Sequence, residues 1–122
     1  MLTVLVVEDI RIHREMIKAE LRGRFPSLVI EEASTGEEAM KKINISPPQL
    51  IFMDIGLPDA NGLQLTQKIK ADFPNIRISI LTVYDLPEYR QAAIQHGADR
   101  FFVKDSVKWD EVVAFIKSVP GI

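Results

Sequence analysis

The chain has no cysteine among its 122 residues, which excludes a disulfide framework and a thiolate metal site. An excess of one charge is also lacking, since 15 Lys and Arg stand against 17 Asp and Glu. We therefore expect no direct contact with nucleic acid or an anionic membrane. No apolar run is long enough to span a membrane, and Glu8 and Asp9 interrupt the first one too early for a signal peptide. These absences together predict a cytoplasmic protein.

What remains is an ordinary globular composition. Hydrophobic residues make up 47% of the chain and charged residues 26%, both close to the average of folded domains. We find no internal repeat, low-complexity segment or linker. The sequence therefore predicts a single domain covering residues 1–122, large enough to bury roughly two thirds of its unfolded surface.

The most informative stretch is 50–53, where four apolar residues follow one another without alternation. This pattern is typical of a strand that is buried on both faces in a parallel sheet. Asp54 follows immediately, at the end of the strand where ligand chemistry gathers in open α/β sheets. By itself this carboxylate either caps the following turn or takes part in chemistry, since Asp is also a common turn residue.

Strand and helix patterns alternate about five times along the chain, with short connections. We expect strands at 3–7, 28–31, 50–53, 76–81 and 100–103. Helical periodicity follows each of them, and the first helix should run from Ile10 to about Arg22, with Ile10 on its buried face. Right-handed crossovers between successive parallel strands predict a doubly wound α/β fold.

The helix ends carry recognisable signals. Thr35 and Glu38 have the spacing of a capping box. Asp85 precedes Pro87 as an expected N-cap, and Asp105 with Ser106 is expected to cap the last helix. The apolar stripe of that helix is expected at 109, 112, 113 and 116. Phe115 falls off this stripe, so we expect it to be exposed and to mark a partner surface.

Polar residues stand at the ends of four predicted strands. Glu8 and Asp9 follow the first strand, Asp54 the third, Thr82 the fourth and Lys104 the fifth. Parallel strands place these residues along one edge of the sheet, where three carboxylates would repel one another unless a cation neutralises them. Oxygen ligands suit a hard ion, and Mg²⁺ is expected. Carboxylates, a hard cation, a lysine and a hydroxyl together indicate a site for phosphoryl transfer.

With these residues at its strand ends, the chain resembles over its whole length the receiver (CheY-like) domain of two-component response regulators. The resemblance implies a flavodoxin-like (βα)5 sandwich whose central parallel sheet has the strand order 2-1-3-4-5. The residues that carry it are Glu8-Asp9, Asp54, Leu57-Pro58, Gly62, Thr82, Gly97-Ala98, Phe101 and Lys104.

The resemblance also implies roles for these residues. Asp54 would be the phosphoacceptor, and it would receive phosphate from a sensor histidine kinase or a phosphotransfer protein. Glu8 and Asp9 would hold Mg²⁺ together with Asp54 and the backbone carbonyl of Gly56. Lys104 would bind the phosphoryl oxygens.

The signal would leave the site through a second set of residues. Thr82 would turn toward the phosphate, Phe101 would follow it inward, and Tyr84 would line the mouth of the site. The output surface would lie on the fourth helix, fifth strand and last helix, and it would include Tyr89 and Arg100 in addition to Phe115. The histidines His13 and His96 are expected to be structural.

One departure from the family concerns Asp105, which stands where many receivers have a proline with a cis peptide bond. Without proline a cis bond costs about 2.5–4 kcal/mol, and the sequence leaves open whether the Lys104–Asp105 bond is cis or trans. The segments around Gly56, Thr82 and Lys104 resemble the LuxR/FixJ (NarL-like) subgroup. That subgroup implies a DNA-binding output domain and homodimerisation on phosphorylation.

Three function classes compete. The first and preferred class is a phosphorylation-driven switch, which is not an enzyme except that it catalyses its own phosphorylation and dephosphorylation. The switch would control a DNA-binding transcription-regulator domain. Alternatively, it would act as a stand-alone receiver through protein–protein interaction or as a phosphorelay intermediate. The second is a phosphohydrolase of the haloacid dehalogenase type, which needs a second Asp where this chain has Gly56. The third is a degenerate receiver that no longer takes phosphate. Degenerate members usually lose the acceptor, an acidic ligand or the lysine, and all of these are present here.

Overall fold

The computed structural model describes residues 2–121. Within them, five parallel strands form one sheet in the order β2-β1-β3-β4-β5, as predicted. The elements in chain order are β1 (Thr3–Val7), α1 (Arg11–Arg24), β2 (Val29–Ala33), α2 (Gly36–Ile45), β3 (Leu50–Met53), α3 (Gly62–Asp72), β4 (Arg77–Thr82), α4 (Pro87–Gln95), β5 (Arg100–Val103) and α5 (Trp109–Lys117).

The strand β3 lies in the middle of the sheet, as its unbroken apolar run predicts. All four of its residues are buried, because helices cover both faces of the sheet and leave no polar side for alternation. It pairs in parallel with β1 and β4, with Met53 opposite Val7 on one side and Ile80 on the other. The residue after β3 is thereby fixed at the centre of the sheet's carboxyl edge.

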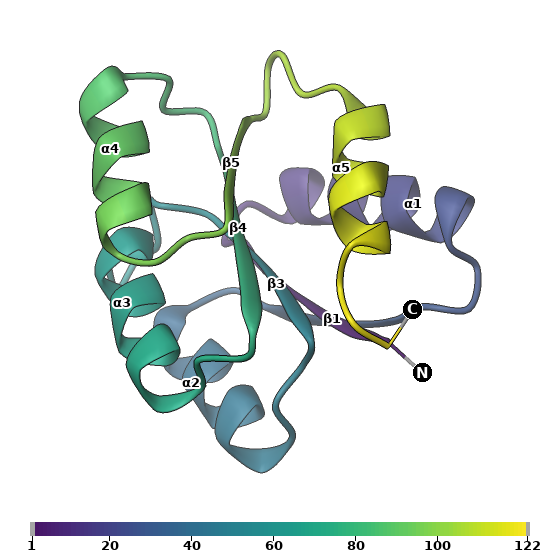
Figure 1. The fold of residues 1–122 in the computed structure, drawn as a ribbon, viewed down its shortest axis with the longest axis horizontal. Helices are drawn as coiled ribbons and strands as arrows, with labels where there is room; N and C mark the ends of the chain where they lie inside the picture. Colours follow the sequence, from purple (N-terminus) through teal and green to yellow (C-terminus); the bar gives the residue numbers. More distant parts are fainter. Residues whose placement is uncertain (1, 122) are drawn as a thin grey trace.

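The helices form two layers, one on each side of the sheet (Figure 1). The helices α2, α3 and α4 pack on one face, over a core that includes Ile51, Ile69 and Ile80. The helices α1 and α5 pack on the other face, over a core that includes Phe52 and Ile116. Successive strand residues supply the two cores in turn, since side chains alternate across a strand.

Several helix and strand ends differ from the sequence prediction. The strand β2 covers Val29–Ala33 rather than 28–31, and α1 continues through Gly23 to Arg24. Ile10 is exposed instead of buried, because it is the N-cap of α1 and lies before the first helical turn. Only the predicted cap of α2 is confirmed, with Thr35 Oγ1 accepting a hydrogen bond from Glu38 N at 3.0 Å.

The other two predicted caps are wrong for local reasons. Asp85 does not cap α4, since Leu86 is its N-cap and the Asp85 carboxylate pairs with Arg90 Nη2 at 3.0 Å. Asp105 and Ser106 lie in a turn closed by a hydrogen bond from Ser106 N to Val103 O, and α5 begins only at Trp109. Among the described residues no peptide bond is cis, so the bond between Lys104 and Asp105 is trans.

The prediction that Phe115 is exposed is also wrong. Its side chain is only 4% exposed and packs in the core between α5 and the sheet. The buried residues of α5 are Val112, Phe115 and Ile116, and Val119, which lies just beyond the end of the helix, is buried too. The helix therefore turns a different side to the sheet from the one predicted. Trp109 and Val113 lie at the flanks of this side and are half-buried.

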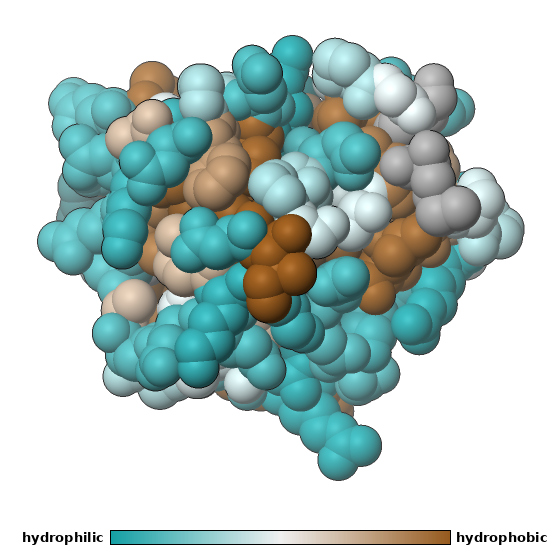
Figure 2. All heavy atoms as spheres, turned by 90° about the horizontal axis from the view of Figure 1, so that it is seen from below, coloured by the Kyte–Doolittle hydropathy of each residue, from teal (hydrophilic) through white to brown (hydrophobic). Residues whose placement is uncertain are grey.

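No helix among the described residues is long and apolar enough to cross a membrane. The face drawn in Figure 2 is mostly hydrophilic, with apolar atoms in separate areas between polar ones.

Candidate functional site

The sheet's hydrogen bonds continue one residue beyond the strands and place the predicted site residues at one edge. Glu8 N donates to Ala33 O at 2.9 Å, and Asp54 N donates to Val7 O at 3.1 Å. Lys104 N donates to Thr82 O at 2.7 Å. The backbones of Glu8, Asp54 and Lys104 are therefore each held by the neighbouring strand.

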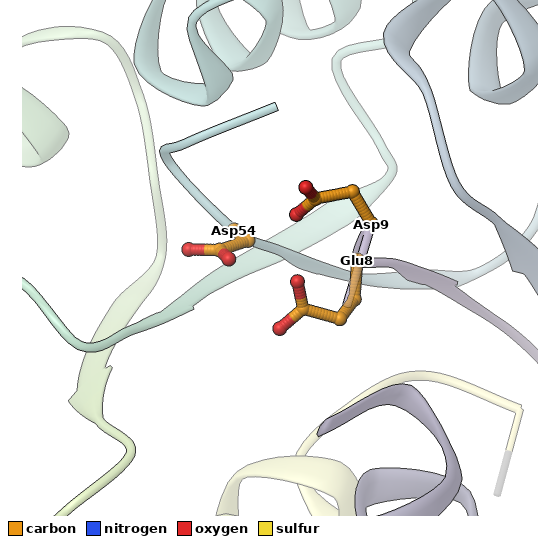
Figure 3. A group of neighbouring side chains, drawn as sticks. All are labelled: Glu8, Asp9 and Asp54. Carbon is orange, nitrogen blue, oxygen red and sulfur yellow. The ribbon is translucent and has the colours of Figure 1, made fainter. Parts of the chain in front are cut away.

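Three carboxylates converge at this edge. Glu8, Asp9 and Asp54 each offer an oxygen within 4.8 Å of the others, and Figure 3 shows their side chains around a common space. Glu8 and Asp54 are buried, whereas Asp9 is exposed. Burial raises the pKa of Glu8 from 4.5 to about 7, and the Asp54 carboxylate adds to this rise while Lys104 opposes it. This crowding of negative charge is what an oxygen-ligated hard cation would relieve.

Lys104 extends from the end of β5 into the same cluster. Its ammonium pairs closely with Glu8 Oε1 and lies 3.2 Å from Asp54 Oδ2. Its third neighbour is His13 Nδ1 at 3.1 Å, from the first turns of α1. The sequence predicts only a structural role for His13, and the one signal for its contact with Lys104 is its position four residues after Asp9.

The loop after β3 holds Asp54 in a fixed orientation. Asp54 Oδ1 accepts a hydrogen bond from Ile55 N at 2.8 Å. The chain then passes so close to itself that a Cβ on Gly62 would lie 1.9 Å from the Asp54 carbonyl oxygen. Asn61 caps α3 by accepting from Leu63 N at 2.8 Å. A glycine at position 62 is therefore required for the loop to close beneath the carboxylate.

The same loop is tied to α2 through Asp59. Its carboxylate accepts hydrogen bonds from Gly36 N at 2.8 Å and Glu37 N at 3.0 Å. These two bonds at the positive end of the helix lower the pKa of Asp59. The sequence analysis missed this contact, which joins positions more than twenty residues apart.

The predicted switch residues lie beside the site. Thr82 is fully buried, and its Oγ1 accepts from Tyr84 N at 3.4 Å. Phe101 pairs with Ile80 in the register of β4 and β5, so it lies on the same sheet face as Thr82. Its ring is half-buried and covered by the Arg90 guanidinium, 4.8 Å from the ring centroid.

Tyr84 lies at the rim of this region and is exposed, and its ring centroid lies 5.5 Å from that of Tyr89 on α4, with the two ring planes tilted by 43°. A Cβ on Gly56 would lie 3.4 Å from the Tyr84 ring, which places the tyrosine over the loop after β3. The role of Tyr84 at the mouth of the site stays a prediction.

The predicted output surface is only partly exposed. Arg100 is exposed on β5, and its guanidinium lies 5.2 Å from the Phe102 ring and 5.9 Å from the Phe115 ring. Tyr89 is half-buried on α4. Phe115 therefore lies buried next to the Arg100 guanidinium and does not itself form part of the surface.

Comparison with known proteins gives a consistent family match. The model of the response regulator receiver domain matches residues 4–117. The DNA-binding transcriptional activator DevR/DosR of Mycobacterium tuberculosis is 34% identical over 120 residues, covering 98% of this chain and 54% of that protein. The response regulator protein VraR of Staphylococcus saprophyticus is 32% identical, covering 94% of this chain and 55% of that protein.

Solved structures agree with this match. The crystal structure of a LuxR-family two-component response regulator from Aurantimonas sp. superposes with a TM-score of 0.84 at 27% identity. The match covers 95% of this chain and 82% of that one. The chain spans about half the length of the curated relatives it matches.

Proposed function

Because the chain belongs to the response regulator receiver domain family, we propose that it is a signalling switch driven by phosphorylation of Asp54. The observation that carries this proposal is the placement of Asp54. Its buried carboxylate lies 3.2 Å from the Lys104 ammonium and next to the carboxylates of Glu8 and Asp9. A phosphohydrolase of the haloacid dehalogenase type is not retained, because the family match covers nearly the whole chain.

The residues fit a magnesium ion. The side-chain donors are all carboxylates, and burial raises the pKa of one of them, Glu8, to about 7. Glu8, Asp9 and Asp54 would hold the ion together with the backbone carbonyl of Gly56. When bound, Mg²⁺ neutralises charge on the cluster and on the phosphoryl oxygens.

The chemistry of the chain's own residues follows from their positions. An oxygen of Asp54 attacks the phosphorus of a phosphohistidine on a sensor histidine kinase or a phosphotransfer protein. The phosphorus–nitrogen bond breaks, and its electron pair leaves with the imidazole, so that an aspartyl phosphate forms. Lys104 stabilises the negative charge of the phosphoryl oxygens, because its ammonium already faces Asp54.

The switch rests on the pair of Thr82 and Phe101. The hydroxyl of Thr82 accepts only a long hydrogen bond of 3.4 Å from Tyr84 N, so it is available to a phosphoryl oxygen. A hydrogen bond to a charged group contributes about 1.5–3 kcal/mol. Shifting a two-state equilibrium from 1:99 to 99:1 requires about 5.5 kcal/mol. Bonds from Thr82 and Lys104 together approach that value, and Phe101 would fill the space that Thr82 vacates.

The output would pass through α4, β5 and α5. Arg90 joins α4 directly to the Phe101 ring, so a movement of Phe101 would reach this helix and its half-buried Tyr89. On β5 the same movement would reach exposed Arg100, the residue before Phe101. The relatives include transcriptional regulators about twice as long as this chain. We therefore propose a homodimer or a DNA-binding output domain as the recipient of the signal.

Phosphorylation at Asp54 can be tested with acetyl phosphate and Mg²⁺. Mass spectrometry should detect one added phosphoryl group on the wild type and none on Asp54→Asn. Asp59→Asn is the matched control, since it alters a carboxylate of the same loop that does not face Lys104, and it should still be labelled. Stoichiometric labelling of Asp54→Asn would contradict the assignment, and an unlabelled wild type would support a degenerate receiver.

The switch can be tested separately by amide NMR of the beryllofluoride-bound protein. In the wild type, shifts should extend to residues 86–96 and 106–117. Thr82→Ala should confine them to the loops around Glu8, Asp54 and Lys104, whereas Thr82→Ser retains the hydroxyl and should preserve the full pattern. Wild-type shifts confined to those loops would refute the switch.

A further inference from the structure

Among the hydrogen-bonding partners of Lys104 within residues 2–121, His13 is the one that is not a carboxylate. Its Nδ1 lies 3.1 Å from Lys104 Nζ and 3.5 Å from Glu8 Oε1, and a third of its side chain is exposed. The Lys104 side chain itself is only 5% exposed. The imidazole therefore covers the ammonium on the side that faces α1.

The identity of the donor in this contact follows from the lysine. A charged ammonium has three N–H donors and no acceptor. In the described part of the chain, the Lys104 ammonium has three atoms within hydrogen-bonding distance, namely Glu8 Oε1, Asp54 Oδ2 and His13 Nδ1. His13 Nδ1 must accept, which places the ring proton on Nε2. The three donors of Lys104 are thus matched by three acceptors.

We infer that His13 is a positioning residue for Lys104, an inference that rests on the proposed function. The two carboxylates that now hold the ammonium are the ones that a cation and a phosphoryl group would engage. Glu8 attracts Lys104 less strongly once its charge is shared with a cation. The Asp54 carboxylate loses its own charge when it becomes an acyl phosphate, and the negative charge then lies on the phosphoryl oxygens. The imidazole takes part in neither change, so it continues to hold Lys104 where it reaches the acceptor.

The helix that carries His13 is anchored to the site. The next residue, Arg14, donates from Nη1 to Glu8 O at 2.9 Å and from Nε to Glu32 Oε1 at 2.8 Å. These bonds fix the first turns of α1 to the ends of β1 and β2. His13 and Glu8 therefore keep their relative positions, and the imidazole acts as a rigid support on one side of the ammonium.

The test compares His13→Ala with His13→Asn, whose side-chain oxygen can replace the Nδ1 acceptor. Ile12→Ala is the matched control, since Ile12 is the adjacent residue of α1 and is 75% exposed. The affinity for beryllofluoride in saturating Mg²⁺ should fall about threefold to tenfold in His13→Ala, the effect of one hydrogen bond. His13→Asn should recover most of this loss, and Ile12→Ala should match the wild type.

A second measurement needs no phosphate analogue. The ¹⁵N signal of the Lys104 ammonium in the metal-free wild type should show slow hydrogen exchange and a shift that Lys104→Arg removes. In His13→Ala this signal should move and exchange faster, and in His13→Asn it should resemble the wild type. Circular dichroism checks that each variant keeps its helices. If His13→Ala acted only by weakening α1, His13→Asn would not restore the wild-type values, because Asn is a poorer helix former than Ala.

Two results separate the inference from the proposed function. A wild type that binds beryllofluoride, with His13→Ala binding it equally well and an unchanged Lys104 signal, would overturn the role of His13 alone. A wild type that binds no beryllofluoride would overturn the proposed function, and the Lys104 signal would still decide whether His13 holds the ammonium.

Discussion

The ionisation of Glu8 should make the metal-free domain less stable as the pH rises. Glu8 is 1% exposed, and burial raises its pKa from 4.5 to about 7. Between these two values the folded state binds more protons than the unfolded chain, so the free energy of unfolding falls with increasing pH. Because one pKa unit corresponds to about 1.36 kcal/mol, the loss across the whole window is about 3 kcal/mol.

Urea unfolding in the presence of a chelator, from about pH 5 to about pH 8, measures this loss. Glu8→Gln cannot ionise and should remove most of the slope, whereas Glu31→Gln, an exposed position on β2, should retain it. Saturating Mg²⁺ should stabilise the wild type most at the upper end of the range, where Glu8 is a carboxylate. A metal-free stability that stays constant or rises over this range would refute the reasoning, as would an unchanged slope in Glu8→Gln.

Three further substitutions test the loop, the core and the acidic cluster. Gly62→Ala should lower the free energy of unfolding by about 3 kcal/mol or more, because its Cβ would lie 1.9 Å from the Asp54 carbonyl oxygen; Gly23→Ala, which meets open space in α1, should stabilise by about 0.5–1 kcal/mol. Phe115→Ala should cost about 3–5 kcal/mol in urea unfolding, and a cost below about 1 kcal/mol would contradict its burial. Asp9→Ala should raise the Mg²⁺ concentration needed for phosphorylation by acetyl phosphate, and a wild-type rate that is indifferent to chelator would exclude the metal.

The sequence predicted the fold well because the fold depends on signals that are local. The unbroken apolar run at 50–53, which Pro47 and Pro48 precede, is typical of a strand covered on both faces. The glycines and prolines between the periodic segments kept the connections short. The sheet order followed from the resemblance, and the placement of Asp54 and Lys104 at one edge followed from parallel strands. These inferences required no knowledge of how side chains are rotated.

The errors arose where side-chain direction decides the outcome. Phe115 was placed outside the stripe of α5 because the phase of a short helix is fixed by its packing on the sheet and not by its sequence alone. His13 was missed as a neighbour of Lys104 because the two lie 91 positions apart and meet only through the docking of α1. Asp85 prefers Arg90 to the helix backbone, a choice between two local partners that capping rules do not resolve.

The distance along the chain between the partners of the site has a consequence for protein synthesis. Lys104 and Glu8 are 96 positions apart, and Lys104 follows the last strand of the sheet. A nascent chain that has emerged only as far as β4 already carries Asp54 but not its counter-charge. In the proposed function, such a chain cannot accept phosphate productively. Acceptance of phosphate would therefore become possible only after β5 has been synthesised and has added to the edge of the sheet.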